Sequence, residues 1–228
     1  MLNALNRFLD LILPGECLSC GAPKGPFCKK CLRQAETILP EARCLRCGTP
    51  LAEERWGCLH CQDQRTELDI LRVFADYQSP LKEMLHFTKF QGSRKMALWM
   101  GKLLSRVDIP EVDAIVPVPL SKERLIKRGF NQSLLMAEVI SRTKGVPLRK
   151  DVLLKTKDTP PQSLLSGKKR LQNPIGAFSV KGSSPERVLL VDDVYTTGAT
   201  MNECARLLKA SGTKAVYGLV LMRARGND

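Results

Sequence analysis

From about residue 66 onward, apolar runs of strand length alternate with stretches whose apolar residues recur at helical spacing. The runs with strand character cover 68–77, 112–118, 152–155, 177–180, 188–191 and 215–222. The helical stretches cover 79–90, 93–107, 132–143 and 200–210. Strands that alternate with helices of about 10–15 residues are typical of an α/β fold. We therefore predict a parallel sheet flanked by helices.

The N-terminal segment 2–13 carries leucine, isoleucine and phenylalanine at helical spacing, interrupted by polar side chains. It leads to Pro14-Gly15 rather than to the small-residue cleavage site of an export signal. We interpret it as a short amphipathic helix that packs against the protein's own body; docking to a partner or a membrane surface is the alternative. No apolar run in the sequence approaches the roughly 20 residues that span a bilayer. We expect no transmembrane segment and a cytoplasmic protein.

Eight of the nine cysteines fall into four Cys-x-x-Cys pairs. The pairs are Cys17/Cys20, Cys28/Cys31, Cys44/Cys47 and Cys58/Cys61. In a reducing compartment such pairs favour metal over disulfides, and four thiolates fill a tetrahedral Zn²⁺ site completely. We predict two structural zinc sites, with iron as the chemical alternative. Consecutive pairs would make two short zinc ribbons, whereas alternating pairs would make a cross-braced module. The ninth, Cys204, is predicted to be a buried helix residue.

These patterns divide the chain into a cysteine-rich module over 1–65 and an α/β domain over 66–228. The composition, 43% apolar and 26% charged, is ordinary for a globular protein. The formal net charge of +13 is concentrated in 122–181, where fourteen Lys and Arg stand against four Asp and Glu. The module has nine Lys and Arg against seven acids, and its metal-bound thiolates bring its charge to about −2. We expect segment 122–181 to face an anion.

Ligands of parallel α/β sheets lie beyond the carboxyl ends of the strands. One such end is 192–200, sequence DDVYTTGAT, where two acids precede a turn rich in hydroxyls at a helix start. Backbone N–H groups and the helix dipole at this turn suit a phosphate, and Gly198 permits close approach. The acids suit the neutral hydroxyls of a ribose, or a Mg²⁺ already held by pyrophosphate. One ligand with all these features is 5-phosphoribosyl-1-pyrophosphate (PRPP). A P-loop is excluded because the sequence has no Gly-Lys-Ser/Thr.

The segment 188–200 resembles the fingerprint of type I phosphoribosyltransferases: four apolar residues, two acids, a spacer and a Thr-Gly-x-Thr loop. With the paired cysteines ahead of it, the chain is similar over nearly its whole length to the ComF family of competence-associated proteins. Further segments that carry this resemblance are Pro117-Val118-Pro119, Arg128-Gly129-Phe130-Asn131-Gln132-Ser133, and the loop 159–173 with Thr159, Gln162, Leu165, Arg170 and Asn173. In type I phosphoribosyltransferases such a basic loop closes over the pyrophosphate.

The resemblance implies a site for PRPP with Mg²⁺. Asp192 and Asp193 would hold the ribose hydroxyls. The 5′-phosphate would lie in the loop made of Thr196, Thr197, Gly198, Ala199 and Thr200. The pyrophosphate loop would contain Val118 and Pro119. The pyrophosphate charge would be neutralised by Arg124, Lys127 or Arg128, with Arg128 as the leading candidate.

The resemblance also implies a role in natural transformation, with single-stranded DNA and DNA-uptake proteins as partners, and a homodimer like those of type I enzymes. Purine-salvage relatives often place an aspartate between the acidic pair and the Thr-Gly, where this chain has Thr196. No general base of that type and no nucleobase pocket can be recognised. Three functions stay open: a phosphoribosyltransferase with an unidentified acceptor, a DNA-uptake factor, and a PRPP sensor without turnover. With only 5% aromatic residues, DNA is expected to bind mainly through charge.

Overall fold

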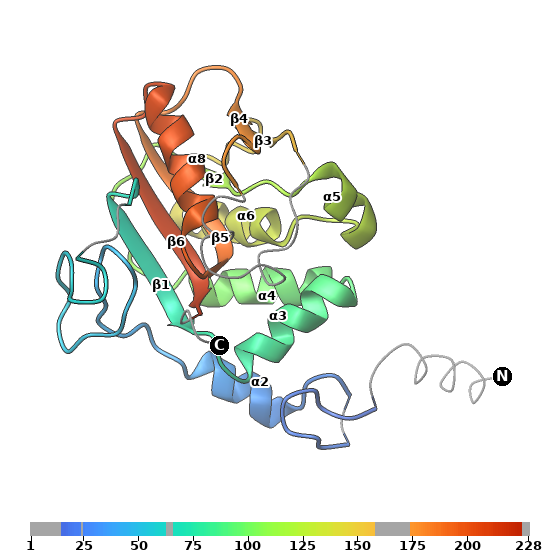
Figure 1. Cartoon of the computed structure of the whole chain (residues 1–228). Helices are drawn as coiled ribbons and strands as arrows, with labels where there is room; N and C mark the ends of the chain where they lie inside the picture. The colour runs from blue at the N-terminus through green and yellow to red at the C-terminus, as the bar shows by residue number, and fades with distance from the viewer. Residues whose placement is uncertain (1–14, 24, 63–65, 158–173, 225–228) are drawn as a thin grey trace.

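The computed structural model describes residues 15–23, 25–62, 66–157 and 174–224. Four parallel strands form its main sheet (Figure 1). Their order is β1 (Ile70–Asp76), β6 (Ala215–Arg223), β5 (Arg187–Tyr195) and β2 (Ala114–Pro117). A separate antiparallel pair is formed by β3 (Leu153–Lys155) and β4 (Phe178–Val180). β5 lies inside the sheet between β6 and β2, and beyond Val191 its carboxyl end pairs, among the described strands, with β6 alone.

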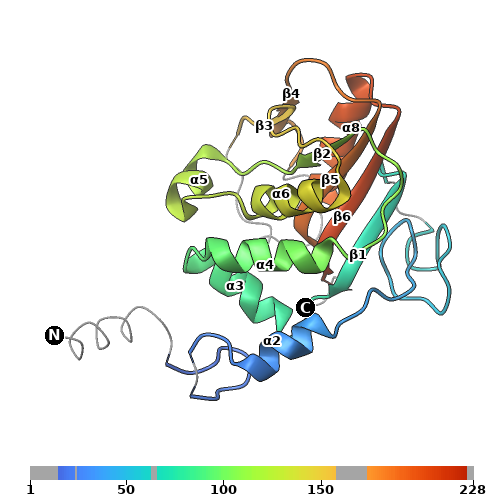
Figure 2. The ribbon, with the colours of Figure 1, turned by 180° about the vertical axis from the view of Figure 1, so that it is seen from behind.

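Helices cover both faces of the sheet (Figures 1 and 2). One face carries α3 (Leu81–Phe90), α4 (Arg94–Leu104) and α6 (Gln132–Lys144), and the other carries α8 (Ala199–Ala210). The short helix α5 (Lys122–Arg128) buries no residue and lies at the rim. This arrangement confirms the predicted α/β class, a parallel sheet flanked by helices.

The side chains of β5 alternate between two apolar cores, as the pleat of a strand requires. Leu189 and Val191 pack with α3, α4 and α6, whereas Val188 and Leu190 pack with α8 and the β3–β4 pair. All four are fully buried. The near-continuous apolar run at 188–191 is therefore the signature of a strand covered on both faces.

The first half of the cysteine-rich module packs against the helical layer. Its helix α2 (Lys29–Glu36) lies below α3 and α4, a placement that can be followed in Figure 2. The rings of Phe27 and Phe87 meet edge to face with 5.5 Å between their centroids. Trp99 of α4 donates its indole N–H to the Glu36 carboxylate at 3.3 Å. The module thus shares a core with the α/β domain.

The second half of the module covers the edge strand β1. The Leu71 N–H donates to the Leu45 carbonyl at 2.7 Å, and the Arg223 Nε donates to the Cys47 carbonyl at 2.6 Å. An added Cβ on Gly48 would stand 2.5 Å from the Val73 side chain, so the backbone of the turn lies directly on the strand. An exposed strand edge is prone to pair with other chains, and this contact protects it.

Several element boundaries differ from the sequence prediction. β5 continues through both acids to Tyr195 because β6 runs beside it, pairing Asp192 with Val220 and Val194 with Met222. Helices α2 and α5 were not predicted, since each is short and rich in charged residues. The predicted helix over 2–13 and the loop 159–173 lie outside the described residues, and the boundary at 65/66 stays a prediction.

Candidate functional site

The two acids at the end of β5 are held from neighbouring helices. Asp192 Oδ1 accepts hydrogen bonds from the Ser133 hydroxyl at 2.9 Å and from the Asp193 N–H at 2.9 Å. Asp193 Oδ2 accepts from the Gln132 amide at 2.6 Å and lies 3.0 Å from the Lys89 ammonium. Gln132 and Ser133 open α6, whereas Lys89 comes from the last turn of α3. Two helices therefore converge on adjacent carboxylates.

Each carboxylate contacts the described part of the protein through one of its two oxygens. Among the described residues, the contacts of Asp192 fall on Oδ1 and those of Asp193 fall on Oδ2. A carboxylate has about four lone-pair positions, and hydroxyl groups are good donors to them. The second oxygen of each acid can therefore accept from a ligand. Two neighbouring acceptors of this kind match two neighbouring hydroxyls of a sugar.

The charges of these acids are strongly coupled. Burial and the neighbouring Asp193 charge raise the pKa of Asp192 to about 7, although the Asp193 N–H, the Ser133 hydroxyl and Lys89 oppose the rise. Arg128 stands close enough for both acids to favour its charged form, while burial lowers its pKa. The site thus concentrates negative charge that a ligand with hydroxyl donors would stabilise.

A tight turn joins β5 to α8 immediately after the acids. Gly198 adopts a left-handed conformation with φ of 77° and caps the N-terminus of α8. A Cβ added there would lie 2.2 Å from the Tyr195 hydroxyl, so the buried Tyr195 ring fills the space beneath the turn. The turn borders a shallow hollow lined by Asp192, Val194, Tyr195, Thr196, Gly198, Ala199, Thr200 and Met201. Backbone N–H groups at a helix start beside such a hollow suit an anion.

A second loop follows β2 beside this turn. The Val118 N–H donates to the Val191 carbonyl at 2.9 Å, and the Val118 carbonyl accepts from the Asn131 amide at 2.9 Å. Asn131 also caps α6 through its side-chain oxygen. Because the Val118 backbone is occupied and Pro119 has no N–H, this loop can offer backbone donors to a ligand only from Leu120 onward.

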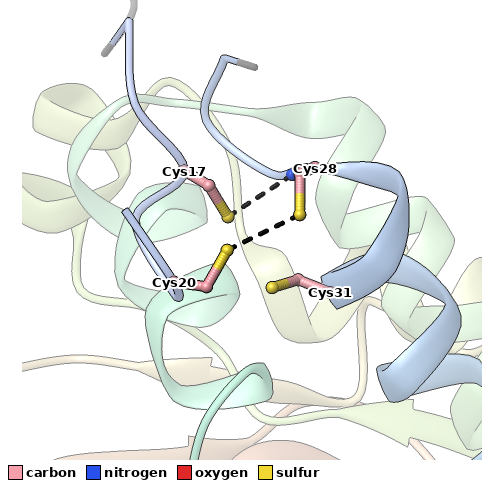
Figure 3. A group of neighbouring side chains, drawn as sticks. All are labelled: Cys17, Cys20, Cys28 and Cys31. Carbon is pink, nitrogen blue, oxygen red and sulfur yellow. Dashed lines mark hydrogen bonds between the residues drawn. The ribbon is translucent and has the colours of Figure 1, made fainter. Parts of the chain in front are cut away.

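The eight paired cysteines form two groups of four, the first of which is drawn in Figure 3. The groups are Cys17, Cys20, Cys28 and Cys31, and Cys44, Cys47, Cys58 and Cys61, with the sulfurs of each group within 4.8 Å of one another. Sulfur–sulfur distances of 3.6 to 3.7 Å are found in both groups. Tetrahedral zinc with bonds of about 2.3 Å sets its sulfurs about 3.8 Å apart, so both groups fit zinc. Consecutive pairs are joined, as in two zinc ribbons, and the cross-braced arrangement is wrong.

Relatives with assigned names match this chain along most of its length. Competence protein F of Haemophilus influenzae is 32% identical over 219 residues, which cover 88% of this chain and 92% of the relative. The chain belongs to the ComF family. DNA utilization protein YhgH of Escherichia coli is 32% identical to this ComF protein over 93% of the chain and 99% of the relative. Competence protein ComFC of Bacillus subtilis is 32% identical over 89% of the chain and 86% of the relative.

Two family models match separate parts of this ComF protein. The double zinc ribbon domain matches residues 8–64, and the phosphoribosyl transferase domain matches residues 131–227. Among solved structures, orotate phosphoribosyltransferase from Aeropyrum pernix shares 20% identity over 63% of this chain and 64% of its own, with a TM-score of 0.35. That likeness is too distant to inform the ligand. In the described part of the chain, no helix is long and apolar enough to cross a membrane.

The structure of this ComF protein brings the predicted site segments together. Val118 bonds to β5, and Arg128 reaches the acids through Gln132, whose Oε1 accepts from the guanidinium at 3.2 Å. Their roles toward a ligand stay predictions. The sequence prediction did not place Lys89 or Gln132 at the site. Gln132 and Ser133 stood in a segment with family resemblance, whereas no signal in the sequence linked Lys89 to an acid more than a hundred residues away.

Proposed function

We propose that this ComF protein binds PRPP with Mg²⁺ at the carboxyl end of β5. The observation that carries the proposal is the pair of consecutive carboxylates Asp192 and Asp193, each held by the described residues through one oxygen and directly before a turn at a helix start. The 5′-phosphate would lie against the turn at Thr196 to Thr200, and the ribose hydroxyls would meet the two acids. A single sugar phosphate carries both of these groups.

The pyrophosphate of that ligand would extend toward the loop after β2. Among the predicted basic groups, Arg128 has a half-buried guanidinium whose charged form is favoured by both acids. Mg²⁺ would be held by pyrophosphate oxygens and supplies charge neutralisation to the leaving group when bound. The protein's own contribution is to fix the ribose and its phosphate relative to that group.

Turnover and sensing are two uses of the same site. Position 196 is a threonine, so the carboxylate that assists the base in purine-salvage relatives is missing at this position. Transfer to an acceptor therefore depends on leaving-group stabilisation and positioning. Release of pyrophosphate from PRPP in the presence of nucleobases would establish an enzyme, and tight binding without release would favour a sensor.

The test of PRPP binding is a calorimetric titration of the zinc-loaded chain with PRPP and Mg²⁺, beside ribose 5-phosphate. We expect saturable binding of both, with PRPP tighter because of its pyrophosphate. Asp192→Asn combined with Asp193→Asn should abolish PRPP binding and leave the zinc content unchanged. Wild-type affinity in that double variant would remove the ribose site from the molecule.

A role in DNA handling is the second function that an observation favours. The names of two relatives refer to competence and DNA utilization. On the described surface, an aromatic stripe is formed by Tyr77, His86 and Phe90, with ring centroids 6.3 and 5.8 Å apart. Lys82 stands 5.6 Å over the Tyr77 ring, and the Phe90 side chain is 71% exposed. Rings interleaved with cations suit single-stranded nucleic acid.

His86 and Phe90 of the stripe lie on α3, the helix that carries Lys89, so a nucleic-acid strand bound there would approach the β5 acids. We infer that this ComF protein holds single-stranded DNA by charge and by a few stacked bases, in the service of DNA uptake. The stripe supplies rings on which bases can stack, although only 5% of the residues are aromatic. Its rings and the basic segment 122–181 can be tested separately from the PRPP site.

A further inference from the structure

Lys89 makes a direct ion pair in the centre of the site. Its ammonium lies 3.0 Å from Asp193 Oδ2, and the two side chains are 21% and 8% exposed. The pair therefore sits where water screens charge poorly. Lys89 reaches this oxygen from the end of α3, while Gln132 reaches the same oxygen from the start of α6.

We propose that Lys89 is a positioning residue of the ribose site: it holds Asp193 by Oδ2 and thereby turns Oδ1 toward a hydroxyl of the bound sugar. This inference rests on the proposed PRPP site. Neither the cysteine modules nor the phosphate turn takes part in it. The proposal adds a residue from a helix that lies outside every segment of the sequence-based site.

The need for such a residue follows from the two acids. Asp192 and Asp193 are consecutive, and the N–H of Asp193 is bonded to Asp192 Oδ1, so their charges lie close together in a partly buried place. Gln132 is neutral and cannot offset the second charge. A charge-assisted hydrogen bond from Lys89 both offsets that charge and fixes the plane of the carboxylate. Without it, Asp193 can rotate or take up a proton and lose its acceptor.

Gln132 completes the fixation from a second helix. Its amide N–H₂ donates to Asp193 and its Oε1 accepts from Arg128, so its orientation is set at both ends. Asp193 Oδ2 thus makes an ion pair with a cation from one helix and a hydrogen bond with an amide from another. A ligand hydroxyl meets an acceptor whose position is already fixed, which lowers the ordering cost of binding.

The test compares two sugar phosphates of equal charge on the full zinc-loaded chain. Calorimetry with ribose 5-phosphate and 2-deoxyribose 5-phosphate gives the preference for the intact diol. In Lys89→Met we expect this preference to fall roughly tenfold, the scale of one charge-assisted hydrogen bond. Lys89→Arg should restore much of it. Lys102→Met removes one exposed charge from the neighbouring helix α4 and should leave the preference unchanged.

The ratio of the affinities for the two sugar phosphates distinguishes a positioning role of Lys89 from a general effect of its charge. If Lys89→Met weakens both sugar phosphates equally, Lys89 acts only through its charge and the inference is overturned. An unchanged ratio and affinity overturns it as well. Thermal melts establish that the variants fold, and Lys89→Gln serves the same comparison if the Met variant is insoluble. If the wild-type chain binds neither PRPP nor the sugar phosphates, the proposed function itself fails, and this inference falls with it.

Discussion

At the scale of single residues, Asp192 and Asp193 differ in how the protein compensates their charges. Asp193 makes an ion pair with the Lys89 ammonium, whereas among the described residues Asp192 accepts from a hydroxyl and a backbone N–H, and the Lys89 charge lowers its pKa without an ion pair. Burial and the neighbouring charge raise the Asp192 pKa to about 7, above its value in the unfolded chain. Its contribution to stability is therefore fully present at acidic pH and is lost as pH rises through about 7.

We predict that Asp192→Asn stabilises the fold while it weakens sugar binding. An asparagine oxygen can still accept from Ser133 and from the Asp193 N–H, and the buried charge is removed. We expect a gain of about 1–3 kcal/mol in the free energy of unfolding at pH 8.5 and a smaller gain at pH 5.5. Urea unfolding at both pH values, with zinc retention checked, measures it.

Asp193→Asn is the matched control, because it breaks the ion pair with Lys89 instead of relieving an uncompensated charge. We expect this variant to be no more stable than the wild-type chain at pH 8.5. A loss of stability in Asp192→Asn at that pH would show that its charge is compensated in the folded state after all.

At the scale of elements, the second zinc ribbon depends on its contact with β1. Gly48 has φ of 71° and an added Cβ would meet the Val73 side chain at 2.5 Å. Gly57 has φ of 83° in the same ribbon, yet nothing lies within 4 Å of its added Cβ. Both glycines therefore adopt a left-handed backbone conformation, but only at Gly48 would an added Cβ clash with a neighbouring side chain.

We predict that Gly48→Ala destabilises the protein more than Gly57→Ala. Both substitutions force a left-handed alanine, at about 1 kcal/mol. Gly48→Ala must also displace the ribbon from β1, which adds about 1–3 kcal/mol. Chemical unfolding of the zinc-loaded variants gives the difference. Equal losses would mean that the ribbon and the edge strand are not packed together in solution.

The elements also show what local sequence can and cannot predict. The apolar run of β5 and the cysteine pairs could be predicted because each structure depends on a pattern within its own short segment. The ends of β5 were not, since its continuation through Asp192 is decided by the neighbouring β6. Helix α5 buries no side chain, and a polar helix leaves no apolar periodicity to detect. The cover of β1 by Leu45 is a tertiary contact without a local signature.

At the scale of the whole molecule, the same limit applies to the site. The acids and the phosphate turn lie in one continuous segment, so the sequence predicted them together. Lys89 and Gln132 reach that segment from distant helices, and only the packing of α3 and α6 on one face of the sheet brings them there. Pairing of consecutive cysteines was likewise one of two possibilities until the folded chain separated the groups.

Charge over the whole molecule favours the α/β domain as the surface of the proposed contact with DNA. Segment 122–181 carries fourteen basic against four acidic residues, whereas the cysteine module becomes slightly negative once metal is bound. Lys122 and Lys127 are exposed on α5, and Lys29 and Lys30 are exposed on α2. Substituting either pair removes two positive charges, from the α/β domain in one case and from the cysteine module in the other.

We predict that Lys122→Gln with Lys127→Gln weakens single-stranded DNA binding, and that Lys29→Gln with Lys30→Gln does not. Each lost phosphate contact should lower the slope of log affinity against log salt by about 0.7.

Phe90→Ala should weaken binding with little change in that slope, because a stacked base releases no counterion. Fluorescence anisotropy across a salt series measures all three variants. Equal losses from α5 and α2 would instead place the zinc ribbons within the DNA interface, and PRPP titration of the same variants shows whether the two ligands use separate surfaces.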